Sequence, residues 1–181
     1  MKIILDAFGG DNAPLEIIKG AALSIEEFGI DVILTGDEDI IRKTAQENAV
    51  SLEHMEIVHA PGVITMDDEA SAAVKRKTDS SMTAGLALLA EGKGDAFVSA
   101  GNSGALVVGA TLLVKRIKGV RRPGFAPVMP TETGCAMLID CGANVECRPE
   151  MLLQFGQMGS IYMDKVMGVK NPRVGLANVG T

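Results

Sequence analysis

Short apolar runs alternate with longer segments of helical spacing along the whole chain. We expect six strands, at Lys2–Asp6, Asp31–Thr35, Met55–His59, Asp95–Ala100, Cys135–Asp140 and Arg173–Val179. Most of these runs are continuously apolar, which is typical of strands buried on both faces of a parallel sheet. Strands joined through helices form right-handed crossovers that cover both faces of such a sheet. The pattern therefore predicts a three-layer α/β/α fold with a mostly parallel sheet.

Start and stop signals place three helices between or after these strands. One helix has Pro14 in its first turn and ends at Gly29, and a second follows the capping cluster Asp79–Ser81 and ends at Gly92. A third helix follows Pro149, and we expect its buried face to carry Met151, Phe155, Met158 and Tyr162.

The chain is expected to form one domain, because residues 1–181 contain neither a low-complexity linker nor a repeat. A chain of this length buries about 70% of its unfolded surface and needs no disulfide or metal for stability. The last expected strand, Arg173–Val179, is not followed by a helix. We therefore expect this α/β unit to be the N-terminal part of a longer chain.

The composition disfavours several classes of protein. Aromatic residues make up 3% of the chain and its net charge is −6, which disfavours nucleic-acid binding by base stacking or by the overall field. The three cysteines lack the paired spacing of zinc sites, and the apolar stretch near the start, Ile3–Leu5, is too short for a signal peptide. We expect a cytoplasmic protein with reduced thiols.

Glycine is over-represented, with 21 of 181 residues, and it clusters at the carboxyl ends of expected strands. The four clusters are Asp6–Pro14, Ser99–Ala105, Asp140–Asn144 and Asn178–Thr181. Glycine lets backbone N–H groups approach a ligand closely, and open α/β sheets bind ligands at this edge. Turn geometry alone explains any one of these loops. Four such loops, each with Asp, Asn or Ser beside the glycine, favour an anion site.

The usual catalytic and nucleotide motifs are absent from the sequence. It contains no GxGxxG, no GxxxxGKS/T and no GxSxG nucleophile elbow. Asp67–Glu69 has the residue types of a metal site, but an acidic helix start explains it more simply, so we expect no metal. His59 follows an expected strand and is interpreted as structural. Lys75 and Lys77 are expected either to contact an anion at the glycine loops or to pack beneath them.

Seven motifs, in this order along the chain, resemble the PlsX family of bacterial acyl-carrier-protein:phosphate acyltransferases. They are Asp6–Asp11, Lys75–Met82, Ser99–Ala105, Arg122–Pro130, Asp140–Asn144, Leu152–Phe155 and Asn178–Thr181. The resemblance covers essentially all 181 residues. Two positions depart from the family pattern: Phe8 stands where Met is usual, and Ala70 where Pro is common. Both differences are interpreted as structural.

The resemblance implies a fold similar to the isocitrate/isopropylmalate dehydrogenase-like group, which phosphate acetyltransferases share. It implies transfer of a fatty acyl group from acyl carrier protein to inorganic phosphate. The product is the acyl phosphate that a membrane glycerol-3-phosphate acyltransferase uses for phospholipid synthesis. The resemblance further implies a homodimer that associates peripherally with the membrane. We expect no cofactor.

Phosphate is itself the nucleophile in this reaction, so the protein needs a cradle of donors rather than an activated serine or cysteine. The residues expected to be catalytic are Asp11, Asn102 and Asn144. The residues expected to contact phosphate or substrate are Gly9, Gly10, Ser103, Gly104, Lys75 and Lys77. Because bare carboxylates repel phosphate, Asp6, Asp11 and Asp140 are expected to orient other groups or to cap helices.

Two alternative functions stay open at this point. A phosphate acetyl- or butyryltransferase of the same fold would use a short-chain acyl-CoA. A non-catalytic fragment would bind the carrier protein without turnover. The basic stretch Lys115–Arg122 is either a solvated face or a docking surface for the acidic carrier protein.

Overall fold

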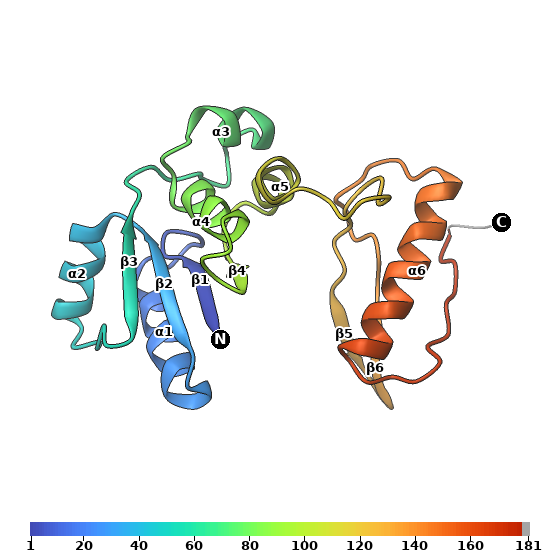
Figure 1. Cartoon of the computed structure of the whole chain (residues 1–181), viewed down its shortest axis with the longest axis horizontal. Coiled ribbons are helices and arrows are strands. Elements are labelled where there is room, and N and C mark those ends of the chain that lie inside the picture. Colours follow the sequence, from blue (N-terminus) through green and yellow to red (C-terminus); the bar gives the residue numbers. More distant parts are fainter. Residues whose placement is uncertain (179–181) are drawn as a thin grey trace. The chain divides into compact units, whose positions relative to one another are not determined.

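A computed structural model describes residues 1–178 of the chain. Contacts within the chain divide it into two compact units, which we name unit 1 (Met1–Lys115) and unit 2 (Arg116–Thr181). Figure 1 shows the elements of each unit. That residues 1–181 act as one domain stays a prediction.

Unit 1 is built on a four-stranded sheet in which every neighbouring pair is parallel. Its strands are β1 (Lys2–Asp6), β2 (Asp31–Gly36), β3 (Met55–His59) and β4 (Ala96–Val98), in the order β3-β2-β1-β4. The predicted parallel sheet is confirmed, and β1 and β3 have the predicted bounds. β4 ends two residues earlier than predicted, and the Ser99 side chain that follows it accepts a hydrogen bond from the N–H of Gly101.

The helices of unit 1 begin at polar caps that the sequence supplies. They are α1 (Leu15–Phe28), α2 (Glu38–Glu47), α3 (Ala70–Arg76), α4 (Ser81–Ala90) and α5 (Ser103–Gly109), with the π-helical turn η1 (Ala110–Val114) after α5. Ser80 caps α4 as predicted, and Gly29 ends α1 in the left-handed region at a φ of 61°. Glu69 accepts hydrogen bonds from the N–H groups of Ser71 and Ala72, which confirms that the acidic run starts a helix.

Two apolar clusters bury the two faces of this sheet. One cluster joins β2 to α1 and α2 and includes Ile18, Val32 and Leu34. The other joins α3, α4 and α5 and includes Met82 and Leu86. Helices therefore cover both faces of the sheet, and the three-layer arrangement is confirmed for unit 1. A strand enclosed in this way has no polar face, which explains the continuous apolar runs.

Unit 2 contains a β-hairpin and one long helix. Its elements are β5 (Val128–Thr131), β6 (Gly134–Met137) and α6 (Pro149–Lys165). The prediction of a parallel-sheet strand over Cys135–Asp140 is wrong, because β6 pairs antiparallel with β5. Two strands joined by only two residues must be antiparallel, since a parallel pair needs a long crossover. The sequence pattern missed β5 because Pro130 interrupts its apolar run.

The predicted strand at Arg173–Val179 is also wrong where the structure describes it. Residues 173–178 form no strand, and Val179 lies outside the described residues. α6 starts at Pro149 as predicted, and it buries Met151, Phe155 and Met163. Tyr162, expected on the buried face, is 42% exposed. No helix among residues 1–178 combines the length and the apolar character needed to cross a membrane.

Candidate functional site

Two glycine loops of unit 1 meet at the carboxyl edge of its sheet. One loop follows β1 and the other follows β4, and these two strands are paired in parallel. A Cβ atom added to Gly9 would lie 2.7 Å from Asp6 Oδ2, 2.7 Å from Ser99 Oγ and 2.9 Å from the backbone nitrogen of Gly101. Only glycine fits at this position, because these distances are shorter than any ordinary carbon contact. The predicted convergence of these two loops is therefore present in the structure.

A buried carboxylate holds these two loops together. Asp6 is 2% exposed, and its Oδ2 accepts a hydrogen bond of 2.7 Å from Ser99 Oγ. Its Oδ1 accepts one of 3.2 Å from the N–H of Phe8. Ser99 Oγ in turn accepts a bond of 3.1 Å from the N–H of Gly101. Asp6 and Ser99 thus orient the backbone of both loops without presenting a charge to the solvent, the kind of role expected for Asp6.

Asn102 lies at the start of α5 and is buried. Its Oδ1 accepts a bond of 2.9 Å from the N–H of Ala105, which caps the helix. Its Nδ2 donates to the carbonyl oxygens of Thr65, at 3.0 Å, and Asp68, at 3.2 Å. Both amide hydrogens are therefore used within the protein. In this conformation Asn102 positions the glycine loop against segment 65–68, and its side chain has no donor left for a ligand.

Lys77 is held by the same segment. Its Nζ donates to Asp68 Oδ2 at 2.6 Å and to the carbonyl oxygen of Val63 at 2.8 Å. The hydrogen bond from Lys77, together with those from Thr65, lowers the pKa of Asp68 below its usual range. Of the two roles expected for Lys77, this geometry corresponds to packing beneath the site.

Several of the expected contact residues are open to solvent. Asp11 directly follows Gly10, whose φ of 110° is unfavourable for any residue with a side chain. Ser103 and Gly104 are the first two residues of α5, and both are exposed. Lys75 is exposed on α3. Of the expected site residues in unit 1, Asp11, Ser103, Gly104 and Lys75 are thus exposed, and Gly10 is half-buried.

Asn144 belongs to a separate hydrogen-bonded turn in unit 2. Asp140 accepts bonds from the N–H groups of Phe125, at 2.7 Å, Ala143, at 3.2 Å, and Asn144, at 2.7 Å. Nδ2 of Asn144 donates to Asp140 Oδ2 and to the carbonyl oxygen of Pro123. Burial raises the pKa of Asp140, but these hydrogen bonds outweigh it, so the pKa lies below its ordinary value.

The fourth glycine loop, Asn178–Thr181, lies outside the described residues from Val179 onward.

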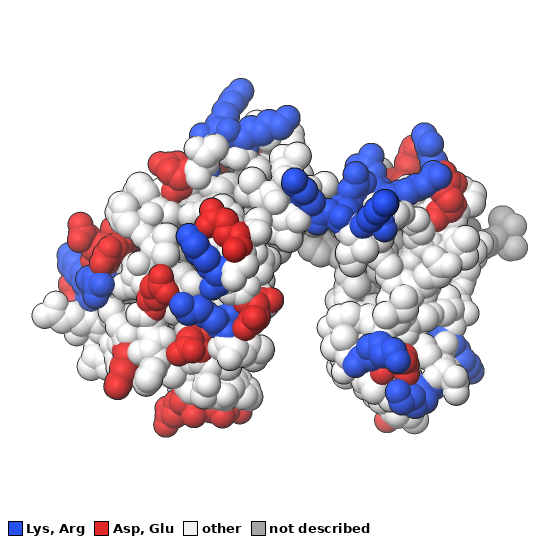
Figure 2. Space-filling model, viewed as in Figure 1, with Lys and Arg blue, Asp and Glu red and all other residues white. Residues whose placement is uncertain are grey.

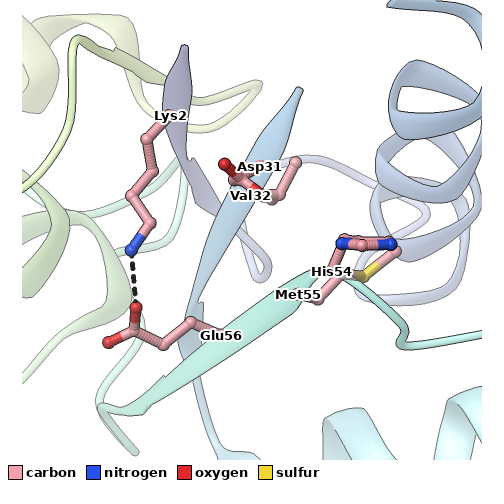
Figure 3. A pocket seen from close by; sticks show the side chains of 6 residues that line it. All are labelled: Lys2, Asp31, Val32, His54, Met55 and Glu56. Atoms are coloured by element: carbon pink, nitrogen blue, oxygen red, sulfur yellow. Dashed lines mark hydrogen bonds and ion pairs between the residues drawn. The ribbon is translucent and has the colours of Figure 1, made fainter. Parts of the chain in front are cut away.

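A hollow of about 420 Å³ occurs in unit 1 away from the glycine loops, and Figure 3 shows its lining. It is lined by residues at or just before the amino ends of β1, β2 and β3, namely Lys2, Asp31, Val32, His54, Met55 and Glu56. An ion pair of 2.8 Å joins Lys2 to Glu56 there. The hollow is thus at the opposite edge of the sheet from the glycine loops.

Two further observations concern metal-ligating side chains. Within residues 1–178, no group of three or more His, Cys, Asp or Glu is placed to hold a metal ion. His59 accepts a hydrogen bond of 3.2 Å at Nδ1 from the N–H of Glu38, so it supports the start of α2 as expected of a structural residue. Sequence reasoning missed Ser99 and Thr65. Ser99 could have been selected because it belongs to the glycine cluster Ser99–Ala105. Thr65 belongs to no motif, so nothing in the sequence was a reason to select it.

Comparison with known proteins gives a match along the whole chain. Residues 1–181 match the model of a family described as "Fatty acid synthesis protein". A phosphate acyltransferase of Alkaliphilus oremlandii is 47% identical over 180 residues, which are 99% of this chain and 54% of the relative. A phosphate acyltransferase of Acetivibrio thermocellus is 46% identical over 181 residues, which are 99% of this chain and 53% of the relative. The chain thus spans about half the length of the curated relatives it matches.

Two solved structures share the fold. EutD phosphotransacetylase from Staphylococcus aureus matches with a TM-score of 0.70 and 21% identity, over 93% of this chain and 54% of that one. A phosphotransacetylase from Streptococcus pyogenes matches with a TM-score of 0.71 and 18% identity, over 93% of this chain and 55% of that one. At this identity the likeness concerns the fold alone. This likeness confirms the expected fold type, because the family resemblance implied a fold that phosphate acetyltransferases share.

Proposed function

The chain belongs to the fatty acid synthesis protein family, and from this we propose that the protein carrying it is a phosphate acyltransferase. We infer that it transfers a fatty acyl group from the thioester of acyl carrier protein to inorganic phosphate, in the service of phospholipid synthesis. The observation that carries the proposal is 47% identity to a phosphate acyltransferase over 99% of this chain. The two converging glycine loops add a site of suitable chemistry.

The proposed reaction needs no nucleophile from the protein. A phosphate oxygen attacks the thioester carbonyl carbon, and the carbonyl oxygen becomes an oxyanion. The C–S bond then breaks, the acyl phosphate leaves, and the thiolate of the carrier protein takes up a proton from solvent. The protein's contribution is to hold phosphate in line with the carbonyl and to donate hydrogen bonds to the oxyanion.

We assign these tasks to residues according to their accessibility. Backbone N–H groups at Gly10, Ser103 and Gly104 are assigned to phosphate or to the oxyanion, and exposed Lys75 supplies positive charge. Asp11 is assigned to orienting a donor, since its own carboxylate would repel phosphate.

The residues already bonded within the protein are assigned supporting roles. Gly9 allows the two loops to approach closely, and Asn102 fixes the start of α5. Lys77 is bonded beneath the loop, and Asn144 stabilises the Asp140 turn in unit 2. These four residues are therefore positioning residues in our proposal.

The test is acyl phosphate formation by the complete gene product that contains this sequence. Hydroxylamine trapping should reveal acyl phosphate with palmitoyl-carrier protein and inorganic phosphate, and much less product with acetyl-CoA. Preference for acetyl-CoA would instead support the short-chain alternative. The 181-residue chain should be assayed beside the complete protein. Carrier-protein binding without product by both proteins would support a non-catalytic binding module.

The family resemblance extends the proposal to assembly and location. We propose a homodimer in the cytoplasm that associates peripherally with membranes, requires no cofactor and passes acyl phosphate to a membrane glycerol-3-phosphate acyltransferase. Analytical ultracentrifugation and vesicle flotation of the complete protein test the first two properties. A monomer that stays away from vesicles of any composition would contradict them.

A further inference from the structure

Charge is divided unevenly between the two units. Residues 1–115 contain 18 Asp and Glu against 9 Lys and Arg, whereas residues 116–181 contain 5 against 8. Unit 2 therefore carries a net positive charge in a chain whose net charge is −6. Figure 2 shows Lys and Arg gathered at the end of unit 2 where α6 begins. This distribution gives an acidic partner one favourable unit and one repulsive unit.

The basic segment at this end is fixed to α6 by hydrogen bonds. The N–H of Arg121 donates to Gln154 Oε1 at 2.9 Å, and Gln154 Nε2 donates to the carbonyl oxygen of Gly119 at 2.9 Å. The guanidinium of Arg121 pairs with Glu150 at 2.8 Å. Arg116 donates to the carbonyl oxygen of Arg121. The segment is thus held in one conformation, which reduces the entropy lost when a partner binds.

The remaining cations of the segment carry uncompensated charge. Arg116, Lys118 and Arg122 are exposed, and within residues 1–178 none of them forms an ion pair. Ile117, between two of them, is 81% exposed. We name these four residues the 116–122 surface. An exposed apolar side chain with a cation on each side of it in the sequence suits a partner helix that has acidic residues around an apolar position.

We propose that the 116–122 surface docks the acyl carrier protein during delivery of the acyl group. The inference rests on the proposed function, which supplies an acidic protein as the substrate carrier. A protein partner suits the surface better than a membrane, because hydrogen bonds to Gln154 fix the backbone of the segment on α6, and Ile117 is the one exposed apolar side chain of residues 116–122. A membrane needs no fixed spacing of cations and gains most from a larger apolar area.

Charge reversal of two cations tests the proposal. We expect Arg116→Glu together with Lys118→Glu, in the complete gene product, to raise KM for palmitoyl-carrier protein about tenfold at low ionic strength. The effect should shrink at high salt, because exposed charges are screened. KM for phosphate and kcat should stay at wild-type values. Lys118→Gln should give a smaller increase in KM, and it guards against misfolding of the double variant.

Arg173→Glu is the matched control, since it introduces the same kind of charge change at an exposed position of unit 2. It should leave KM for the carrier protein unchanged. Binding of fluorescently labelled carrier protein should be titrated in parallel, so that docking is measured without turnover. Flotation with vesicles containing phosphatidylglycerol measures membrane binding of the same variants.

The outcomes separate this proposal from the proposed function. If acyl phosphate forms and the double reversal leaves both KM and carrier binding unchanged, the docking surface is refuted while the function stands. If no acyl phosphate forms but the double reversal weakens carrier binding, the docking proposal is supported and the proposed acyltransferase activity is refuted. A double reversal that abolishes only vesicle binding would overturn the proposal in favour of a membrane contact.

Discussion

Gly9 is the residue at which the two glycine loops of unit 1 come closest. A methyl group at this position would overlap two oxygen atoms and a backbone nitrogen that belong to both loops. We expect Gly9→Ala to lower the free energy of unfolding by about 1–3 kcal/mol, since crowding of this kind forces the backbone to shift. Urea denaturation measures the change, and acyl phosphate formation by the complete protein should fall with it.

Gly20 provides a matched control for this substitution. It lies inside α1, and an added Cβ there meets no atom within 4 Å. Gly20→Ala should therefore raise the free energy of unfolding by about 0.5–1 kcal/mol, because alanine loses less backbone entropy in a helix. Equal effects of the two substitutions would contradict the close approach seen at Gly9.

Ser99 links the buried Asp6 to the second glycine loop. Ser99→Ala leaves Asp6 Oδ2 without its donor and the N–H of Gly101 without its acceptor. We expect a loss of about 1–3 kcal/mol in the free energy of unfolding, measured by urea denaturation. The control is Ser24→Ala, because Ser24 only donates to a carbonyl within an exposed part of α1. A loss no larger than that of the control would show that the clamp adds little stability.

Asn102 shows where sequence reasoning about single residues stops. Its position after a glycine at a strand end correctly placed it at the edge of the sheet. Its side chain nevertheless points to carbonyl groups of Thr65 and Asp68, which are 37 and 34 positions away in the sequence. Hydrogen bonds over such separations depend on how the helices pack, and no local pattern encodes them. The residue was therefore predicted in the right place, its side-chain amide hydrogens are bonded within the protein, and its expected catalytic role stays a prediction.

At the scale of the elements, the turn between β6 and α6 depends on the ionised form of Asp140. The pKa of Asp140 lies below its ordinary value of 3.8, since the hydrogen bonds that it accepts outweigh its burial. Its contribution to stability is therefore complete above that value and is lost as the pH falls toward the pKa of the folded state. We expect the unfolding free energy of the wild type to decrease more steeply below pH 4 than that of Asp140→Asn.

Urea denaturation at a series of pH values between about 2 and 6 measures this difference. Asp68 also has a lowered pKa, chiefly through its bond to Lys77, so it contributes a pH dependence of the same sign. Asp68→Asn provides a comparison, because it should remove the contribution of Asp68 and leave that of Asp140. Parallel curves for the wild type and Asp140→Asn would show that the carboxylate at 140 does not stabilise the fold.

The elements of unit 1 were predictable because their environment is reflected in simple patterns. In β2, Val32 and Leu34 pack in the cluster beside α1, and Ile33, whose side chain points to the opposite face, is buried as well. Both faces of the strand therefore need apolar residues. In unit 2 the apolar run at Cys135 correctly indicated a strand, but strand direction was not readable from it. The pairing followed from the short turn and from β5, which Pro130 concealed.

At the scale of the whole molecule, the two units differ in how their strands are protected. β1 lies between two neighbouring strands, and both faces of its sheet are covered by helices. β5 and β6 pair only with each other within residues 1–178, and each has exposed residues along its length. Two-stranded hairpins have little stability of their own, so local opening should cost less free energy in unit 2.

Hydrogen exchange of the 181-residue chain, followed by mass spectrometry, tests this difference. Peptides from β1 and β2 should exchange at least about tenfold more slowly than peptides from β5 and β6. α6 should give intermediate protection, because it buries Phe155 but exposes Leu153 and Ile161. Equal protection of β1 and β6 would mean that the two units open together as one cooperative structure, as a single domain would. That result would favour the one-domain organisation expected from the sequence, whereas separate rates would favour two units that fold with different stabilities.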